Sequence, residues 1–179
     1  MKIIARIHTD FPDKFGIPRQ SGLIDELRAT VVFEPEYRNN DALRGLEEYS
    51  HIWLLWQFSE NIRSKWKPTV RPPKLGGNTR KGVFATRSPF RPNPIGLSAV
   101  KLQSIEYNTH QGAVLHISGA DLMDNTPIYD IKPYLPLVDS YQDAKGGFTE
   151  NIDYTPLDVS ISDDLKKALP QDKISALIK

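Results

Sequence analysis

The residues best suited to chemistry lie in a proline-rich segment, Ala85-Thr86-Arg87-Ser88-Pro89-Phe90-Arg91-Pro92-Asn93-Pro94-Ile95-Gly96. Proline fixes its own φ and restrains the residue before it, so this segment should form a loop of nearly fixed shape. On such a loop Arg87 and Arg91 would lose little entropy when they bind a carboxylate or a phosphate through their planar guanidinium groups. The pattern predicts an anion-binding loop. The alternative is a rigid turn whose arginines pair with surface acids.

The charge of the chain is strongly segregated around this loop. Residues 61–105 contain no Asp or Glu and ten basic residues, whereas the rest of the chain has 13 basic and 22 acidic residues. Such segregation indicates a polyanionic partner or an anionic substrate group. We therefore predict that most of these cations share one face, in particular Arg63, Lys67, Arg71, Lys74, Arg80 and Arg91. The alternative is an ordinary basic surface whose acids lie elsewhere in sequence but nearby in space.

Three aspartates make a second cluster, Asp121, Asp124 and Asp130, within residues 119–134. Carboxylates at strand ends could hold hydroxyl or amino groups or accept a proton, although Asp also favours turns through its own backbone. Asp124 precedes the turn-forming Asn125-Thr126-Pro127, so we expect a structural role for it. Asp130 and Lys132 should share one face of a strand, where the lysine would keep the carboxylate ionised.

The elements that must position these residues are mostly strands. Apolar or alternating segments predict strands at 2–9, 29–33, 51–58, 83–86, 97–105, 113–118, 128–131 and 157–161. Helices are expected at 41–49, capped by Asn40, and near the end of the chain, capped by Ser162 and by Asp172. This spacing predicts a mainly β fold, an antiparallel barrel or sandwich with short helices.

The composition excludes several classes of protein. Of 179 residues 39% are hydrophobic and 25% charged, so the chain can bury a core. There is no cysteine, and the four histidines lack metal-ligand spacing, so we expect neither disulfides nor a metal site. No apolar run reaches the roughly 18 residues of a membrane helix. The polar start, Met1-Lys2-Ile3-Ile4-Ala5-Arg6, is no signal peptide, and we expect a cytoplasmic protein without a membrane partner.

Two long motifs resemble signatures of the TrmO family, also called YaeB or TsaA-like. The first comprises residues 71–78 and 82–96, and the second comprises residues 124–136. Pro18-Arg19-Gln20 and residues 45–53 fit as well, so the resemblance extends in order over about residues 1–140. It implies a homodimeric β-barrel-like enzyme, distinct from the Rossmann-like methyltransferases, that uses S-adenosylmethionine.

The reaction implied by the resemblance is methylation of tRNA at N6 of threonylcarbamoyl-adenosine, at position 37 next to the anticodon of threonine tRNA. Residues 1–140 would form the TsaA-like catalytic domain, and residues 141–179 would be a linker, a last strand and the start of a C-terminal helical region. Longer bacterial members continue beyond this point, so we expect a truncated or naturally short chain.

The resemblance also implies site residues. Cofactor contacts are expected from Pro18, Arg19, Gln20, Glu60, Asn61, Arg87, Leu97, Ser118, Gly119, Ala120 and Asp121. From the basic segment we expect RNA contacts by Arg71, Lys74, Arg80 and Arg91. A splayed base of the anticodon loop could stack on Tyr129, Tyr134, Phe90 or Arg91.

The reaction itself needs a group that takes a proton from the acceptor nitrogen. We predict that Asp130 orients or deprotonates this nitrogen, that Lys132 tunes the carboxylate or meets a phosphate, and that Arg87 clamps substrate or cofactor. A purely structural Asp130–Lys132 pair is the alternative. Two other functions stay open: a non-catalytic sensor or adaptor that binds S-adenosylmethionine or RNA, and a methyltransferase with another substrate.

Overall fold

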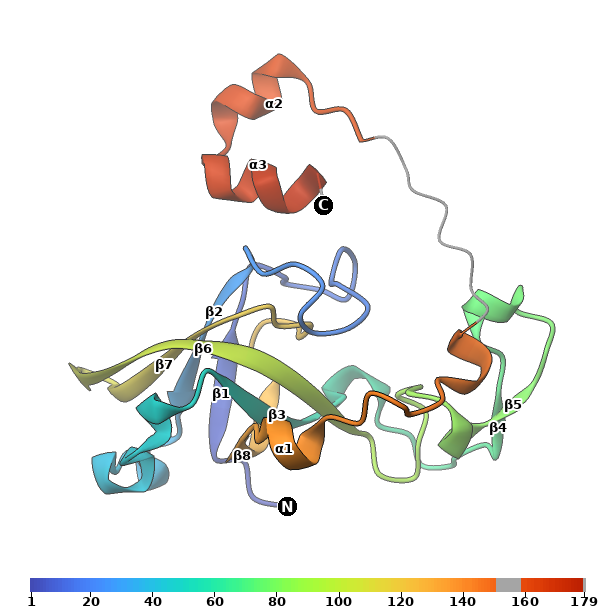
Figure 1. Ribbon diagram of the computed structural model, residues 1–179, viewed down its shortest axis with the longest axis horizontal. Coiled ribbons are helices and arrows are strands. Elements are labelled where there is room, and N and C mark those ends of the chain that lie inside the picture. Colours follow the sequence, from blue (N-terminus) through green and yellow to red (C-terminus); the bar gives the residue numbers. More distant parts are fainter. Residues whose placement is uncertain (151–158, 179) are drawn as a thin grey trace.

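The computed structural model describes residues 1–150 and 159–178, and six of its strands close into an antiparallel barrel (Figure 1). The order around the barrel is β1 (Ala5–His8), β2 (Arg28–Phe33), β7 (Gly112–Ser118), β6 (Ile95–Thr109), β3 (His51–Gln57) and β8 (Pro127–Pro133), and β8 pairs with β1. Closure leaves no open sheet edge in the barrel. The expected antiparallel, mainly β fold is confirmed.

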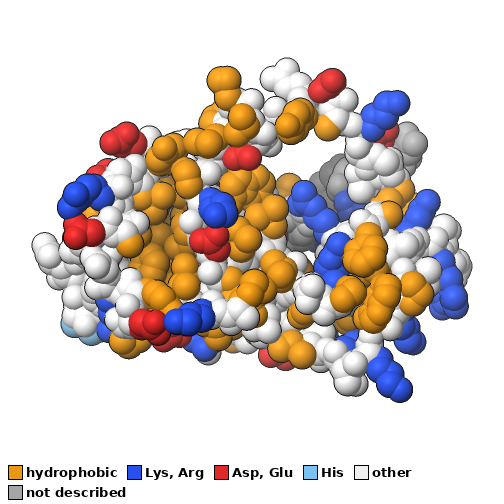
Figure 2. Space-filling model, turned by 90° about the horizontal axis from the view of Figure 1, so that it is seen from below, with side chains coloured by type: hydrophobic (Ala, Val, Ile, Leu, Met, Phe, Trp, Pro, Cys, Tyr) orange, Lys and Arg blue, Asp and Glu red, His pale blue; other side chains and the backbone are white. Residues whose placement is uncertain are grey.

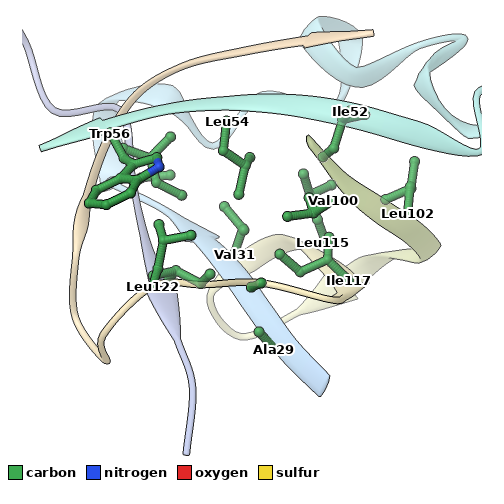
Figure 3. Close-up of a cluster of buried hydrophobic side chains, with 14 of the residues drawn as sticks. Ala29, Val31, Ile52, Leu54, Trp56, Val100, Leu102, Leu115, Ile117 and Leu122 are labelled. Atoms are coloured by element: carbon green, nitrogen blue, oxygen red, sulfur yellow. The ribbon is translucent and has the colours of Figure 1, made fainter. Parts of the chain in front are cut away.

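The core of the barrel follows from the alternation of side chains along its strands. In β3, Ile52, Leu54 and Trp56 are buried, whereas Trp53 and Leu55 between them are only half-buried and belong to the outer face. Figure 3 shows the inward side chains meeting from several strands, with Trp56 at one end of the cluster. A barrel of this size is filled by side chains and leaves no internal channel.

A close approach between two strands shapes that end of the core. Trp56 lies opposite Gly96 in the β3–β6 register, and its ring packs onto the glycine backbone. A Cβ atom at position 96 would lie within 2.6 Å of three atoms of the indole. The ring also packs against Phe58, at 4.3 Å between centroids. Glycine at position 96 therefore allows the indole to fill the barrel at this point.

Outside the barrel, two sequence predictions were wrong in detail. The helix expected at 41–49 is two 3-10 turns, η2 (Asn40–Leu43) and η3 (Leu46–Glu48), separated by Gly45 at a φ of 85°. Its cap is Asn39, which accepts a hydrogen bond from the Asp41 N–H, and not Asn40. The strand expected at 83–86 is the 3-10 turn η6 (Val83–Ala85). Next to it β5 (Lys81–Gly82) pairs with β4 (Thr69–Val70) in a separate ribbon.

The remaining elements are short. They are the 3-10 turns η1 (Pro35–Tyr37), η4 (Ser59–Asn61), η5 (Pro73–Leu75) and η7 (Gly147–Thr149) and the helices α1 (Pro136–Asp139), α2 (Asp163–Ala168) and α3 (Gln171–Ile178). Within residues 1–150 and 159–178, no helix has the length and apolar character needed to cross a membrane.

The C-terminal helices lie apart from the barrel core, beside the loop that follows β1 (Figure 1). Ser162 caps α2 as predicted, through a hydrogen bond from the Leu165 N–H to its hydroxyl oxygen. The second helix begins at Gln171, before the expected cap Asp172. In α3, Lys173 pairs with Asp10 and Ile174 is buried, so this helix is docked on the loop. Of the strand expected at 157–161, residues 157–158 lie outside the described residues, and 159–161 form no strand.

Candidate functional site

A large open cleft of about 2090 Å³ lies beside the barrel, between the basic segment, the arginine loop and residues 145–149. No acidic residue lines it among the residues that the structure describes. Eleven cationic side chains do: Arg19, Arg63, Lys65, Lys67, Arg71, Lys74, Arg80, Lys81, Arg87, Arg91 and Lys145. The predicted common face of the basic segment is therefore this cleft, which includes nine of its ten cations; Lys101 is the exception.

Within residues 1–150 and 159–178, carboxylates leave most of the positive charge of the cleft without an ion pair. Leaving Lys74 aside, none of these cations forms a salt bridge with an acidic side chain in residues 1–150 and 159–178. Three of them face aromatic rings instead: Arg63 over Phe90 at 4.0 Å, Arg91 over Phe84 at 5.7 Å and Lys81 over Phe148 at 5.9 Å. A cleft with this field attracts anions and raises their local concentration.

Hydrogen bonds fasten the arginine loop in addition to its prolines. The Thr86 hydroxyl donates to the Val83 carbonyl at 2.9 Å and accepts from the Ser88 N–H at 3.2 Å. Arg91 Nη1 donates to the carbonyl oxygens of Thr86, at 2.7 Å, and Val83, at 3.2 Å. Arg91 therefore holds the loop together as well as lining the cleft, while Arg87 is exposed.

Three segments that are far apart in the sequence meet at Arg87. Its Nη1 donates a hydrogen bond to the Gln20 side-chain oxygen, which joins the arginine loop to the loop after β1. That second loop is joined to residue 119 by a hydrogen bond from the Gly22 N–H to the Gly119 carbonyl oxygen, at 2.9 Å. Gly119 has a φ of 74° and approaches Gly22 so closely that a Cβ would lie 3.4 Å from its backbone. Gln20, Arg87 and the 118–121 segment are thus brought together, and their contact with a cofactor stays a prediction.

Asp121 is the half-buried carboxylate of this meeting point. Its Oδ1 accepts a hydrogen bond from the Ser98 hydroxyl at 2.5 Å, and the Ser98 oxygen accepts one from Trp56 Nε1 at 2.9 Å. Burial raises the pKa of Asp121, and the hydrogen bonds from Ser98 and the Ser21 backbone together with the charge of Arg87 offset only part of this effect. A carboxylate in this state is suited to bind a cation or to hold a proton.

The other expected cofactor residues are placed unevenly. Arg19 and Asn61 line the cleft, and Pro18 is half-buried beside Arg19. Glu60 is exposed next to Asn61 and does not line the cleft. Leu97 lies on the outer face of β6, opposite Leu55. Ser118, Gly119 and Ala120 are buried, and the Ser118 hydroxyl oxygen accepts a hydrogen bond from Gln103 at 2.8 Å.

Asp130 and Lys132 lie on the outside of the barrel and not in the cleft. They share one face of β8, as predicted, and form an ion pair with 2.9 Å between Nζ and Oδ2. Their register partners on β3 are Leu55 and Trp53. Within one chain they are therefore not assembled with Arg87.

Asp124 has the structural role that its turn context predicts. Its Oδ1 accepts a hydrogen bond from the Thr9 N–H at 3.1 Å and lies 3.4 Å from His8 Nδ1. It thereby ties the end of β1 to the turn before β8. In the described part of the chain, no cluster of three or more His, Asp or Glu side chains is arranged to hold a metal ion.

Sequence reasoning missed one pair of cleft residues, Trp66 and Phe84. Their rings stack with 5.9 Å between centroids and 30° between planes. Both line the cleft and both remain open to solvent, Trp66 by 48% and Phe84 by 71%. The available signal was the presence of aromatic residues inside a basic segment without acids. Of the aromatic residues on which a splayed base was predicted to stack, Phe90 lines the cleft, whereas Tyr129 and Tyr134 do not.

A second exposed surface is apolar and lies on the outside of β6 and along α1. Leu97, Leu137 and Val138 are all more than half exposed there. Trp53 Nε1 holds α1 to the barrel by donating to Asp139 Oδ2 at 2.9 Å, and the Leu135 N–H and this indole lower the pKa of Asp139. Figure 2 views the side on which α1 lies, and hydrophobic side chains there cover wide areas with few charged groups between them.

Comparisons with known proteins agree on one family. The family described as tRNA-methyltransferase O N-terminal domain matches residues 6–140. A tRNA (adenine(37)-N6)-methyltransferase of Escherichia coli is 42% identical over 166 residues, which make up 93% of this chain and 70% of that protein. A Pseudomonas aeruginosa relative, whose name describes an S-adenosylmethionine-dependent methyltransferase, is 45% identical over 147 residues, 82% of this chain and 62% of its own length.

Solved structures give the same relationship. The crystal structure of TrmO from Pseudomonas aeruginosa superimposes with a TM-score of 0.69 at 39% identity, covering 86% of this chain and 63% of that one. The chain thus spans about two thirds of the length of these relatives.

Proposed function

Because the chain belongs to the tRNA-methyltransferase O N-terminal domain family, we propose that it methylates N6 of adenine 37 in tRNA, with S-adenosylmethionine as the methyl donor. The observation that carries this proposal is the cleft, which is lined by eleven cations and, among the described residues, by no acid. Such a cleft fits the phosphates of an anticodon stem-loop. The finer substrate is threonylcarbamoyl-adenosine in threonine tRNA, and the site of action is the cytoplasm.

The meeting point of Gln20, Arg87 and Asp121 suits the amino-acid end of the methyl donor. That end has an ammonium and a carboxylate group, so its binding needs one anion and one cation close together. Asp121 and Arg87 supply this pair, since they lie close enough for the arginine to lower the pKa of the aspartate. Gln20, hydrogen bonded to Arg87, would hold the guanidinium in position. When bound, the donor supplies an activated methyl group on its sulfonium.

The chain's own part in the reaction is to position the acceptor and to take its proton. Methyl transfer depends mainly on an in-line approach of donor and acceptor, which a stiff loop and a preformed cleft favour. The acceptor nitrogen must also lose a proton, for which Asp130 is our candidate base. Since Asp130 lies on the outer face of β8, its use requires a site shared between two copies of the chain.

We therefore propose that the active unit is a homodimer. The apolar surface formed by Leu97, Leu137 and Val138 supports this proposal, because exposed apolar areas of this kind often mark protein interfaces. Asp130 and Lys132 belong to the same outer side of the barrel and would then face the partner.

The function is tested with labelled S-adenosylmethionine and two tRNA preparations, one with and one without the threonylcarbamoyl group. We expect label to appear in the nucleoside at position 37 of the carbamoylated threonine tRNA only. Arg87→Ala is the matched negative control, because it leaves the barrel intact. Binding of cofactor and tRNA without any transfer would contradict the proposal and favour a sensor or adaptor.

The shared site is tested by mixing two inactive variants, Arg87→Ala and Asp130→Asn. In a homodimer with shared sites, subunit exchange creates mixed dimers that have one intact site, and about a quarter of the wild-type activity returns. Each variant mixed with itself is the control. If mixing restores no activity, Arg87 and Asp130 do not act together across a dimer.

A further inference from the structure

We propose that Trp66 and Phe84 form a platform on which unpaired bases of the RNA stack, beside the cations that bind its phosphates. This inference rests on the proposed tRNA substrate and names the part of the cleft that binds the bases of the loop. The two stacked rings stay 48% and 71% exposed, so they present apolar area to water in the cleft. Every nucleobase has a π face that can cover such a surface.

The backbone holds the two rings together, although they are 18 positions apart. The β4–β5 ribbon pairs Thr69 with Gly82 and Val70 with Lys81, which brings the segments before β4 and after β5 side by side. The Val83 N–H then donates to the Pro68 carbonyl oxygen at 2.9 Å, and the Val83 side chain is buried. Phe84 follows this anchor directly, and Trp66 lies two residues before Pro68. The platform is therefore preformed.

Arginine planes extend this aromatic surface. Arg91 lies with its guanidinium carbon 5.7 Å from the centre of the Phe84 ring, while its Nη1 is bound to two carbonyl oxygens of the same turn. On a neighbouring part of the cleft, Arg63 lies 4.0 Å over the Phe90 ring. In Figure 2, Lys and Arg side chains surround hydrophobic ones at the right, the end of the molecule where β4 and β5 lie in Figure 1.

Charge and shape together select the occupant. An acidic peptide would be attracted by the cations, but it would have no general use for a flat exposed ring pair. Paired RNA presents its phosphates and keeps its bases stacked on one another, so it would use the cations and leave the rings uncovered. Single-stranded RNA uses both, since its backbone follows a basic groove while its bases stack on aromatic side chains.

The experiment compares two RNA probes near physiological salt: a single strand of about 12 nucleotides, a length within the range of known single-strand sites, and a fully paired hairpin with a minimal loop. We expect Phe84→Ala and Trp66→Ala to weaken binding of the single strand about 5- to 150-fold and to change binding of the hairpin little. Trp66→Phe keeps a ring and should retain most of the affinity. Phe15→Ala removes an exposed aromatic ring outside the cleft, so it is the matched control and should have no effect.

Fluorescence gives a second measurement that does not depend on affinity alone. Of the three tryptophans, Trp66 is the one that lines the cleft, so the single strand should quench emission of the wild type and not of Trp66→Phe. Unchanged single-strand binding by both alanine variants would overturn the platform, and so would an equal loss for both probes. Loss of S-adenosylmethionine binding with RNA binding intact would also overturn it, because the rings would then stack on the cofactor's adenine.

The outcome is separable from that of the proposed function. If the alanine variants selectively lose single-strand binding while the wild-type chain transfers no methyl group, the result supports the platform and contradicts the enzyme. Methyl transfer that is unaffected by both alanine variants, together with unchanged single-strand binding, would support the enzyme and contradict the platform.

Discussion

Replacing Gly96 by alanine tests how the barrel core is connected to the site. The new Cβ would lie within 2.6 Å of three atoms of the Trp56 indole, well inside van der Waals contact, so the ring or the strand has to move. The ring has little room, because it is buried, packs against Phe58 and donates a hydrogen bond to Ser98. Its displacement also disturbs the hydroxyl that holds Asp121.

The magnitude follows from these contacts. Overpacking of a well-packed core costs about 1–3 kcal/mol, and loss of the buried indole hydrogen bond adds about 1 kcal/mol. We therefore expect Gly96→Ala to lower the free energy of unfolding by about 2–4 kcal/mol. For a chain of this length, that corresponds to a decrease in Tm of about 4–16 °C.

The assay is denaturant and thermal unfolding of Gly96→Ala beside a matched glycine variant, Gly82→Ala. Gly82 has an ordinary φ of −57° and nothing within 4 Å of a new Cβ, so its substitution should leave stability unchanged. In a Trp56→Phe background the cost of Gly96→Ala should be smaller, because a smaller ring relieves the clash. Wild-type stability of Gly96→Ala would refute this reasoning, and so would the same cost in both backgrounds.

Four further predictions concern the site. Arg87→Ala should abolish methyl transfer with an unchanged fold, and Arg87→Lys should recover little activity because a point charge cannot replace a planar fork; activity near wild type for the lysine variant would contradict the clamp. Asp121→Asn should raise the free energy of unfolding at neutral pH and have little effect in acid, where both side chains are neutral. Because the folded-state pKa of Asp121 is raised, the wild type loses stability as the pH rises through that pKa. Unfolding curves measured across pH test this, and a variant less stable than the wild type at neutral pH would contradict it. Asp130→Asn should bind cofactor and tRNA normally and lose turnover, whereas an unchanged rate would exclude this carboxylate as the base. Binding of tRNA should weaken by about 10³–10⁵ between low and physiological salt if six to ten phosphates are contacted, and a flat salt dependence would contradict the cleft as the RNA surface.

Several features of the fold and site were predictable because they depend on neighbouring residues alone. The alternation in β3 predicts a strand with one buried face, since side chains alternate across any strand. The prolines around Arg91 stiffen the loop in any fold. Where a local rule failed, a single residue was the reason: Gly45 in a left-handed conformation divides the helix expected at 41–49.

The segregation of charge was also determined by the sequence. With ten cations and no acid in residues 61–105, no arrangement of that segment could give it an acidic surface. The segment's own surface is therefore basic whichever way it folds. What the composition could not decide was whether acids from elsewhere would be packed against it.

Only the tertiary structure decided which groups meet. Arg87 contacts Gln20 across 67 positions, and Asp121 contacts Ser98 across 23, because barrel closure brings those loops together. Register placed Asp130 and Lys132 on the outer face of β8, since a shift by one residue would have turned both inward. The stacking of Trp66 on Phe84 likewise depends on the β4–β5 pairing. Long-range pairing has no local signature, so the sequence determines the chemistry that is available and the fold determines where it is assembled.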